Sequence, residues 1–158
     1  MKTWLVAVAC VVVGLSFGCS QQPPKPGAGP APVPAPAAKG HSHGAGPHGG
    51  AIADWGGGKY HVEFKVDHGK KEATIFILGG DEKTPAPIKA DKIQLSINEP
   101  ATQVDLAAKP QEGDPAGSAS RFVGTHDTLG KVQEFAGTIT GLIDGTPYTG
   151  DFAETPEM

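Results

Sequence analysis

Histidine is the residue type whose placement in this chain most clearly suggests chemistry. Five of the six histidines lie between positions 41 and 68, and three of them, His41, His43 and His48, fall within eight positions. Neutral imidazole is a common ligand of Zn(II), Cu(II) and Ni(II). Because the reference pKa of histidine is about 6.5, its imidazole is mostly deprotonated at neutral pH. This spacing predicts a site for a divalent transition metal, copper or zinc.

The first candidate site is the glycine-rich tract 41–50. In a flexible chain His41 and His43 can close on one ion together, but the tract must become ordered on binding, which lowers the affinity. The alternative interpretation of this tract is a hydrophilic Gly/His linker that holds no ligand.

The second candidate site lies on a predicted strand. His61 and Glu63 share one face of the strand at positions i and i+2, about 6.6 Å apart. That spacing suits two corners of a metal site, and His48 is the predicted third ligand because Gly49 and Gly50 allow its segment to fold back along the sheet. The alternative is an ordinary exposed strand face that carries a charge pair across strands.

His126 is a further candidate metal ligand from a distant part of the sequence. It shares strand parity with Phe122 and Gly124. The alternative interpretation is a buried, hydrogen-bonded histidine or a residue at the end of a strand. A folded metal site requires His48, His61 and a third donor, either Glu63 or His126, to converge.

The elements that must position these side chains are β-strands, since apolar and polar residues alternate with period 2 after residue 50. A helix is expected for no more than one turn, within residues 127–133. An Asp144-Gly145 pair predicts a tight hairpin turn near the C-terminus. The predicted strands cover residues 60–66, 72–78, 92–97, 102–107, 121–125, 135–143 and 146–152. About seven short strands predict an all-β fold, an immunoglobulin-like two-sheet sandwich, with a small β-barrel as the alternative.

The N-terminal region predicts export. Residues 1–18 have the charge, apolar stretch and small residues of a signal peptide, too short to span a bilayer. Gly18-Cys19 resembles the lipobox of bacterial lipoproteins, which implies that Cys19 is acylated and anchors the chain in a membrane. Cleavage by ordinary signal peptidase is the alternative, because Ser16 stands where an aliphatic residue is usual. We expect a disordered Pro/Ala/Gly/His-rich linker at 19–49 and one folded domain at 50–158.

Composition excludes several classes of function. The formal net charge of −4 provides no basic field for nucleic acid. With Cys10 removed and Cys19 acylated, no thiol remains for catalysis or for a disulfide. The sequence also lacks a Gly-x-Ser-x-Gly elbow, a phosphate loop and a His-Glu-x-x-His motif, so we expect a protein that is not an enzyme.

The segment 41–50, with its Gly-Pro-His-Gly-Gly stretch, and the strand at 59–67 resemble the His-rich N-terminal segment and β-domain of periplasmic adaptor proteins of heavy-metal efflux pumps. Residues 87–93 and 108–115 are also similar to that group. The resemblance implies metal handling in the envelope and carries over to His48 and His61. The coiled-coil hairpin and lipoyl-like domains of a pump adaptor are missing here, so the resemblance implies an accessory protein.

These features together predict a non-enzymatic lipoprotein of the cell envelope, facing the periplasm or the cell surface. It is expected to bind copper or zinc as a buffer, a carrier or an accessory to metal efflux, with the membrane and an efflux or envelope protein as partners. The alternative function is a structural or protein-interaction module without a metal site. In that case an edge strand such as 146–152 would pair with a partner chain.

Overall fold

The computed structural model describes residues 44–154, which form eight β-strands and one short 3-10 helix. The strands are β1 (Ala51–Trp55), β2 (Tyr60–Asp67), β3 (Glu72–Gly79), β4 (Lys92–Ile97), β5 (Thr102–Ala108), β6 (Arg121–Thr125), β7 (Phe135–Ile143) and β8 (Thr146–Glu154), and the 3-10 helix is η1 (Asp127–Gly130). All seven ladders are antiparallel, so the predicted all-β class is confirmed. No helix in this part of the chain is long and apolar enough to cross a membrane.

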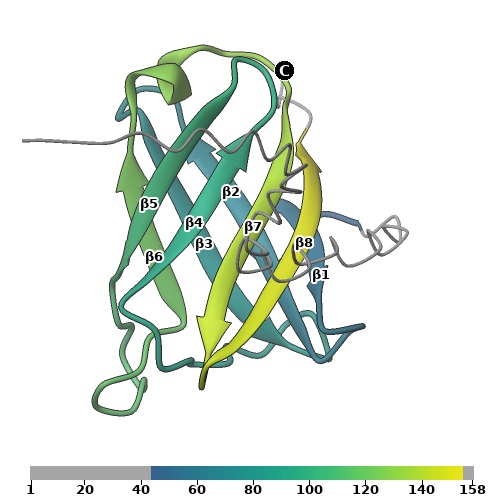
Figure 1. The fold of residues 1–158 in the computed structure, drawn as a ribbon, viewed down its shortest axis with the longest axis vertical. Coiled ribbons are helices and arrows are strands. Elements are labelled where there is room, and N and C mark those ends of the chain that lie inside the picture. Colours follow the sequence, from purple (N-terminus) through teal and green to yellow (C-terminus); the bar gives the residue numbers. More distant parts are fainter. Residues whose placement is uncertain (1–43, 155–158) are drawn as a thin grey trace, which may run out of the picture. The chain divides into compact units, whose positions relative to one another are not determined.

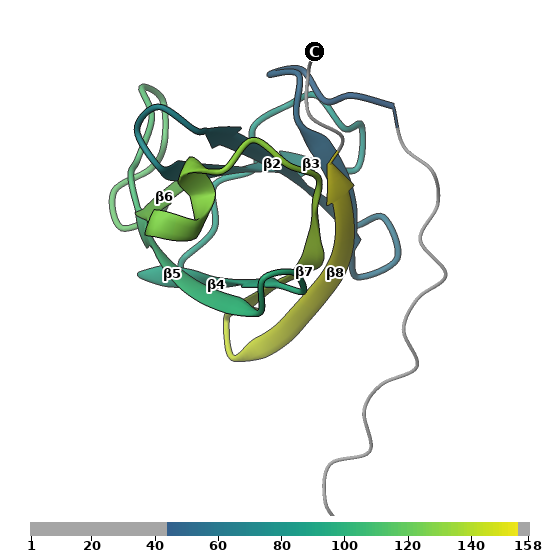
Figure 2. The same cartoon turned by 90° about the horizontal axis from the view of Figure 1, so that it is seen from above.

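The eight strands belong to one sheet with the order β1-β2-β3-β6-β5-β4-β7-β8, which curls into a nearly closed barrel (Figures 1 and 2). Of the two predicted architectures, the small barrel is the one that the structure has. The end strands β1 and β8 lie side by side at the seam. A Cβ atom at Gly150 of β8 would lie only 2.3 Å from the carbonyl oxygen of Asp54 in β1. The sheet thus meets itself with almost no gap at this point.

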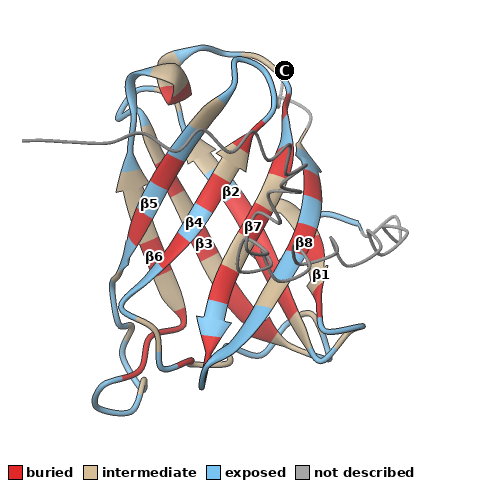
Figure 3. Ribbon diagram, in the orientation of Figure 1, coloured by how far each residue is buried: buried red, intermediate tan, exposed pale blue. Residues whose placement is uncertain are grey.

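Alternation along the strands separates the barrel interior from its surface (Figure 3). Val62 and Phe64 of β2 point inward and are fully buried, as are Ile139 of β7 and Phe135 at its start. The interior is therefore filled by side chains. The short helix η1 lies at one rim of the barrel (Figure 2). Its residue Leu129 is fully buried and belongs to the same core.

The predicted hairpins and the single helical turn are confirmed. Asp144 and Gly145 both have positive φ, +50° and +79°, as a two-residue turn with the right-handed twist of the strands requires. The strand β1 was not predicted. It has only five residues between two glycine-rich segments, and its inward positions are Ala53 and Trp55.

Candidate functional site

Residues 44–50, called here the entry turn, pack against the outer face of β2. The amide of Gly46 donates to the carbonyl of Gly50 at 2.8 Å, and the amide of Gly49 donates to the carbonyl of Gly46 at 2.9 Å. A Cβ atom at Gly46 would lie 2.4 Å from Cδ of Glu63, and one at Gly50 would lie 2.1 Å from the carbonyl oxygen of Phe64. Glycine is required at both positions because the turn approaches β2 so closely.

Glu63 holds the entry turn in place. Its side chain is 0% exposed, and its Oε1 accepts hydrogen bonds from the amides of His48 and Gly50, both at 2.8 Å. Its Oε2 lies 2.7 Å from Nδ1 of His48. Lys65, two residues further along β2, donates from Nζ to the carbonyl of His48 at 2.6 Å. A buried carboxylate is costly unless it is hydrogen-bonded, and here three N–H groups compensate it.

The ring of His48 lies flat on Phe76 of β3, with centroids 3.7 Å apart and an angle of 8° between the planes. Since an ionised carboxylate only accepts hydrogen bonds, Nδ1 of His48 donates to Glu63. Among the described residues, no hydrogen bond is made by Nε2 on the opposite side of the ring. The side chain is 37% exposed, so Nε2 is the nitrogen that remains available to a ligand.

His61 has different partners from His48. It is only 4% exposed, and its Nε2 lies 2.9 Å from Oδ1 of Asp54 and 3.5 Å from Oε1 of Glu82. Its Nδ1 lies 3.0 Å from the carbonyl oxygen of Gly79. The alternative interpretation of His61 and Glu63 as residues of an ordinary exposed strand face is therefore wrong. Both point away from the barrel interior, but the entry turn covers Glu63, while β1 and the loop after β3 supply the partners of His61.

The loop after β3 is shaped by Asp81, which brings Glu82 to His61. The Oδ1 of Asp81 accepts from the amides of Lys83 and Thr84 at 3.1 and 2.9 Å, and its Oδ2 accepts from the hydroxyl of Thr84 at 2.5 Å. Glu82 has a φ of +60°, an uncommon value for a residue with a side chain. The hydrogen bond from the Thr84 hydroxyl, followed by those from the two amides, lowers the pKa of Asp81 from 3.8 to about 2.

We expect the carboxyl carbon of Asp81 to titrate near pH 2 in a carbon-detected NMR titration. Because folding lowers this pKa, the contribution of the carboxylate to stability is present above about pH 4 and is lost as the pH falls toward 2. Replacing Thr84 by alanine removes the largest cause of the shift and should raise the midpoint. An unchanged midpoint in that variant would contradict the assigned role of Thr84.

His126 lies far from the other candidate ligands. It is exposed, directly follows β6 and caps η1, where its Nδ1 accepts from the amide of Thr128 at 3.2 Å. On β3, Glu72 pairs with Thr125 and Leu78 pairs with His61. The step of six positions from Glu72 to Leu78 spans about 20 Å, so His126 cannot join a site with His61. His126 is therefore a residue at the end of a strand, as the alternative interpretation states.

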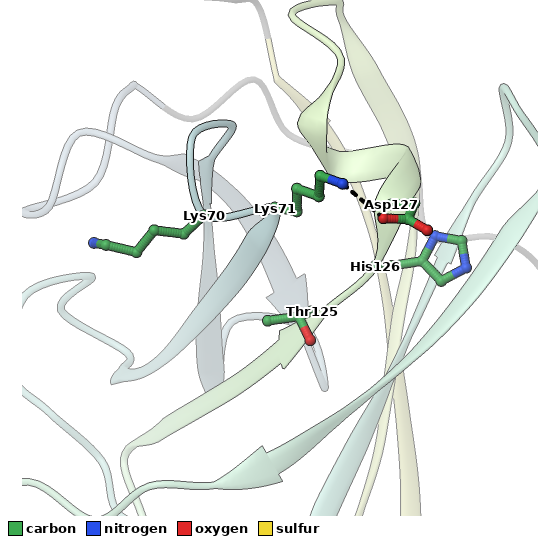
Figure 4. A pocket seen from close by; sticks show the side chains of 5 residues that line it. All are labelled: Lys70, Lys71, Thr125, His126 and Asp127. Carbon is green, nitrogen blue, oxygen red and sulfur yellow. Dashed lines mark hydrogen bonds and ion pairs between the residues drawn. The ribbon is translucent and has the colours of Figure 1, made fainter.

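His126 lies between two shallow surface hollows, one of which is shown in Figure 4. The hollow in Figure 4 is lined by Lys70, Lys71, Thr125, His126 and Asp127. Both lysines are already paired, Lys71 with Asp127 and Lys70 with Asp67, each at 2.8 Å. The hollow thus has little positive charge left to attract an anion.

The structure brings together two of the predicted ligands, His48 and Glu63, and separates both from His126. Within residues 44–154, no three His, Cys, Asp or Glu side chains form a group that could hold a metal ion. Cys19, His41 and His43 lie outside the described residues. Asp54 and Glu82 lie beside His61, and this role was not predicted from the sequence. The pairing of Asp54 with His61 depends on β1, which had not been predicted.

Comparison of the chain with protein-family models, with curated proteins and with solved structures finds no match. The resemblance to efflux adaptor proteins therefore remains a prediction.

Proposed function

We propose that this chain is a non-enzymatic lipoprotein of the cell envelope that binds copper or zinc through its His-rich entry segment. The observation that supports this proposal is the way in which the ring of His48 is held. Its ring is fixed against the barrel by Glu63 and Phe76, and Nε2 is left for a ligand. Metal-binding histidines commonly donate their second nitrogen to a carboxylate in this way.

The further donors proposed for the site are His41 and His43, seven and five residues before His48. Seven residues span at most about 25 Å even when fully extended, so the chain length keeps both imidazoles near His48. A site of three imidazoles suits Cu(II) and Zn(II), and Cu(II) binds more tightly at nitrogen donors. Tethering through Cys19 would place this buffer or carrier at a membrane surface.

The competing proposal, pairing of β8 with a partner strand, has less support in the described residues. The middle of β8 at Gly150 is closely covered by Asp54 of β1. Near its start β8 carries Pro147, which has no amide hydrogen to donate to an added strand. Prolines of this kind protect sheet edges from further pairing.

The test is calorimetric titration of Cu(II) and Zn(II) into the full-length chain in detergent. We expect sub-micromolar binding in the wild type and at least about tenfold weaker binding in His48→Asn, because a ligand rather than a supporting group is lost. His126→Asn is the matched control, since it removes one exposed imidazole far from the entry turn and should bind as the wild type does. No binding in the wild type, or equal binding in both variants, would overturn the proposal.

A further inference from the structure

We propose that Glu63 is a positioning residue, which selects Nε2 of His48 as the metal-binding atom and does not bind the metal itself. This inference rests on the proposed function and specifies how its site is built. It also changes the role predicted for Glu63 from the sequence, where it is a metal ligand.

The hydrogen bonds of Glu63 leave it little capacity to bind a metal. Oε1 accepts two backbone amides, those of His48 and Gly50, and Oε2 accepts Nδ1 of His48. The side chain is completely buried beneath the entry turn, and Gly46 packs directly on its carboxyl group. A metal ion cannot reach these oxygens unless the turn leaves β2.

The same hydrogen bonds determine the tautomer of His48. A neutral imidazole has one N–H, and a carboxylate partner at Nδ1 keeps the hydrogen there. The lone pair is then on Nε2, which makes no hydrogen bond among residues 44–154, and the side chain as a whole is 37% exposed. The negative charge of Glu63 also makes the ring a stronger electron donor, which favours a cationic ligand such as Zn(II) or Cu(II).

The stacking of His48 on Phe76 restricts the rotation of the imidazole ring. With the two planes nearly parallel, rotation of the ring about its bond to the chain would lose this contact. A flip of the ring about this bond would replace Nδ1 by Cδ2 and Nε2 by Cε1, and it is opposed by the hydrogen bond between Nδ1 and Glu63. The donor atom is thus selected before any metal arrives, which lowers the ordering cost of binding.

Glu63→Gln is the informative variant because a glutamine preserves shape and reverses one hydrogen bond. Its carbonyl oxygen can still accept from the amides of His48 and Gly50. Its NH2 group then faces Nδ1 of His48 and donates to it, so the ring hydrogen moves to Nε2. The variant keeps the turn but blocks the metal-binding nitrogen.

The first measurement needs no metal. Long-range 1H–15N correlation spectra of the full-length chain, at a pH of about 8.5 where imidazole is neutral, report which nitrogen carries the hydrogen. We expect His48 to be protonated at Nδ1 in the wild type and at Nε2 in Glu63→Gln. Slow exchange of the Gly50 amide in both proteins would show that the entry turn remains in place.

The second measurement is the affinity for Zn(II) and Cu(II). We expect Glu63→Gln to bind about 10–100-fold more weakly than the wild type. Glu112→Gln is the matched control, because it makes the same substitution at an exposed carboxylate outside the entry turn. Its affinity should stay within about threefold of the wild type.

The outcomes separate the two proposals. A reversed tautomer together with weaker binding supports the inference. An unchanged tautomer, or equal affinity in Glu63→Gln, overturns the positioning role of Glu63 while the wild type still binds metal at His48. If the tautomer reverses but the wild type binds neither metal, the proposed function fails, and with it the assignment of Nε2 as a metal ligand.

Discussion

Replacing Trp55 by alanine is expected to lower the free energy of unfolding by about 3–5 kcal/mol, the range for truncation of a large aromatic core residue. Trp55 is fully buried, and although it belongs to the edge strand β1, its Nε1 donates to the carbonyl of Ile139 in β7 at 3.0 Å. A Cβ atom at Gly141 would lie 2.6 Å from its ring, so the indole fills the space left by that glycine. The tryptophan therefore ties the two ends of the sheet together.

Urea unfolding followed by far-UV circular dichroism would measure this loss. Val132→Ala is the control, because Val132 is 72% exposed and its truncation should change the free energy by less than about 0.5 kcal/mol. Trp55→Phe should fall between the two, since it retains apolar area but leaves the Ile139 carbonyl without its donor, at a cost of about 1–3 kcal/mol. Equal stabilities of Trp55→Ala and the control would contradict the closing role of Trp55.

The second large effect is expected at His61. Replacement by leucine should lower the free energy of unfolding by about 3 kcal/mol, because it removes the imidazole that lies 2.9 Å from the carboxylate of Asp54 in a mostly buried place. The Gly79 carbonyl loses a donor in the same variant, and the loop at Glu82 loses its contact with β2.

Denaturant unfolding of His61→Leu, Asp54→Asn and the double variant would test this pairing. We expect the double variant to be less destabilised than the sum of the two single variants, because each single variant already breaks the contact between the two side chains. Strict additivity would contradict the pairing of His61 with Asp54. Binding of Zn(II) by His61→Leu should match the wild type if His61 has a structural role, which distinguishes that role from the predicted role as a ligand.

Much of the fold could be predicted because strand patterns are local. Alternation identified seven of the eight strands, and the Asp144-Gly145 pair located the last hairpin. The inward side chains Val62 and Phe64 follow the same alternation. The strand β1 was not predicted, because its five residues between glycines are too few to show a clear alternation of apolar and polar residues.

The candidate site could be predicted only in part. The predicted folding back of His48 onto the first predicted strand is found, since its amide and ring both reach Glu63, fifteen residues away. The burial of Glu63 and His61 was not predictable from alternation. Period 2 reports which side of the sheet a residue faces, but not whether another segment covers that side.

The sequence by itself determined seven of the eight strands, their inward faces and the turns, because these depend on the residue types of neighbours along the chain. Only the tertiary structure decided that the sheet closes into a barrel, that Glu63 lies beneath the entry turn, and which groups surround His48 and His61. These arrangements depend on contacts between distant segments, such as Trp55 with Ile139, 84 positions apart. Hydrogen-bond partners of buried polar groups are set by that packing, and they define what each histidine can do.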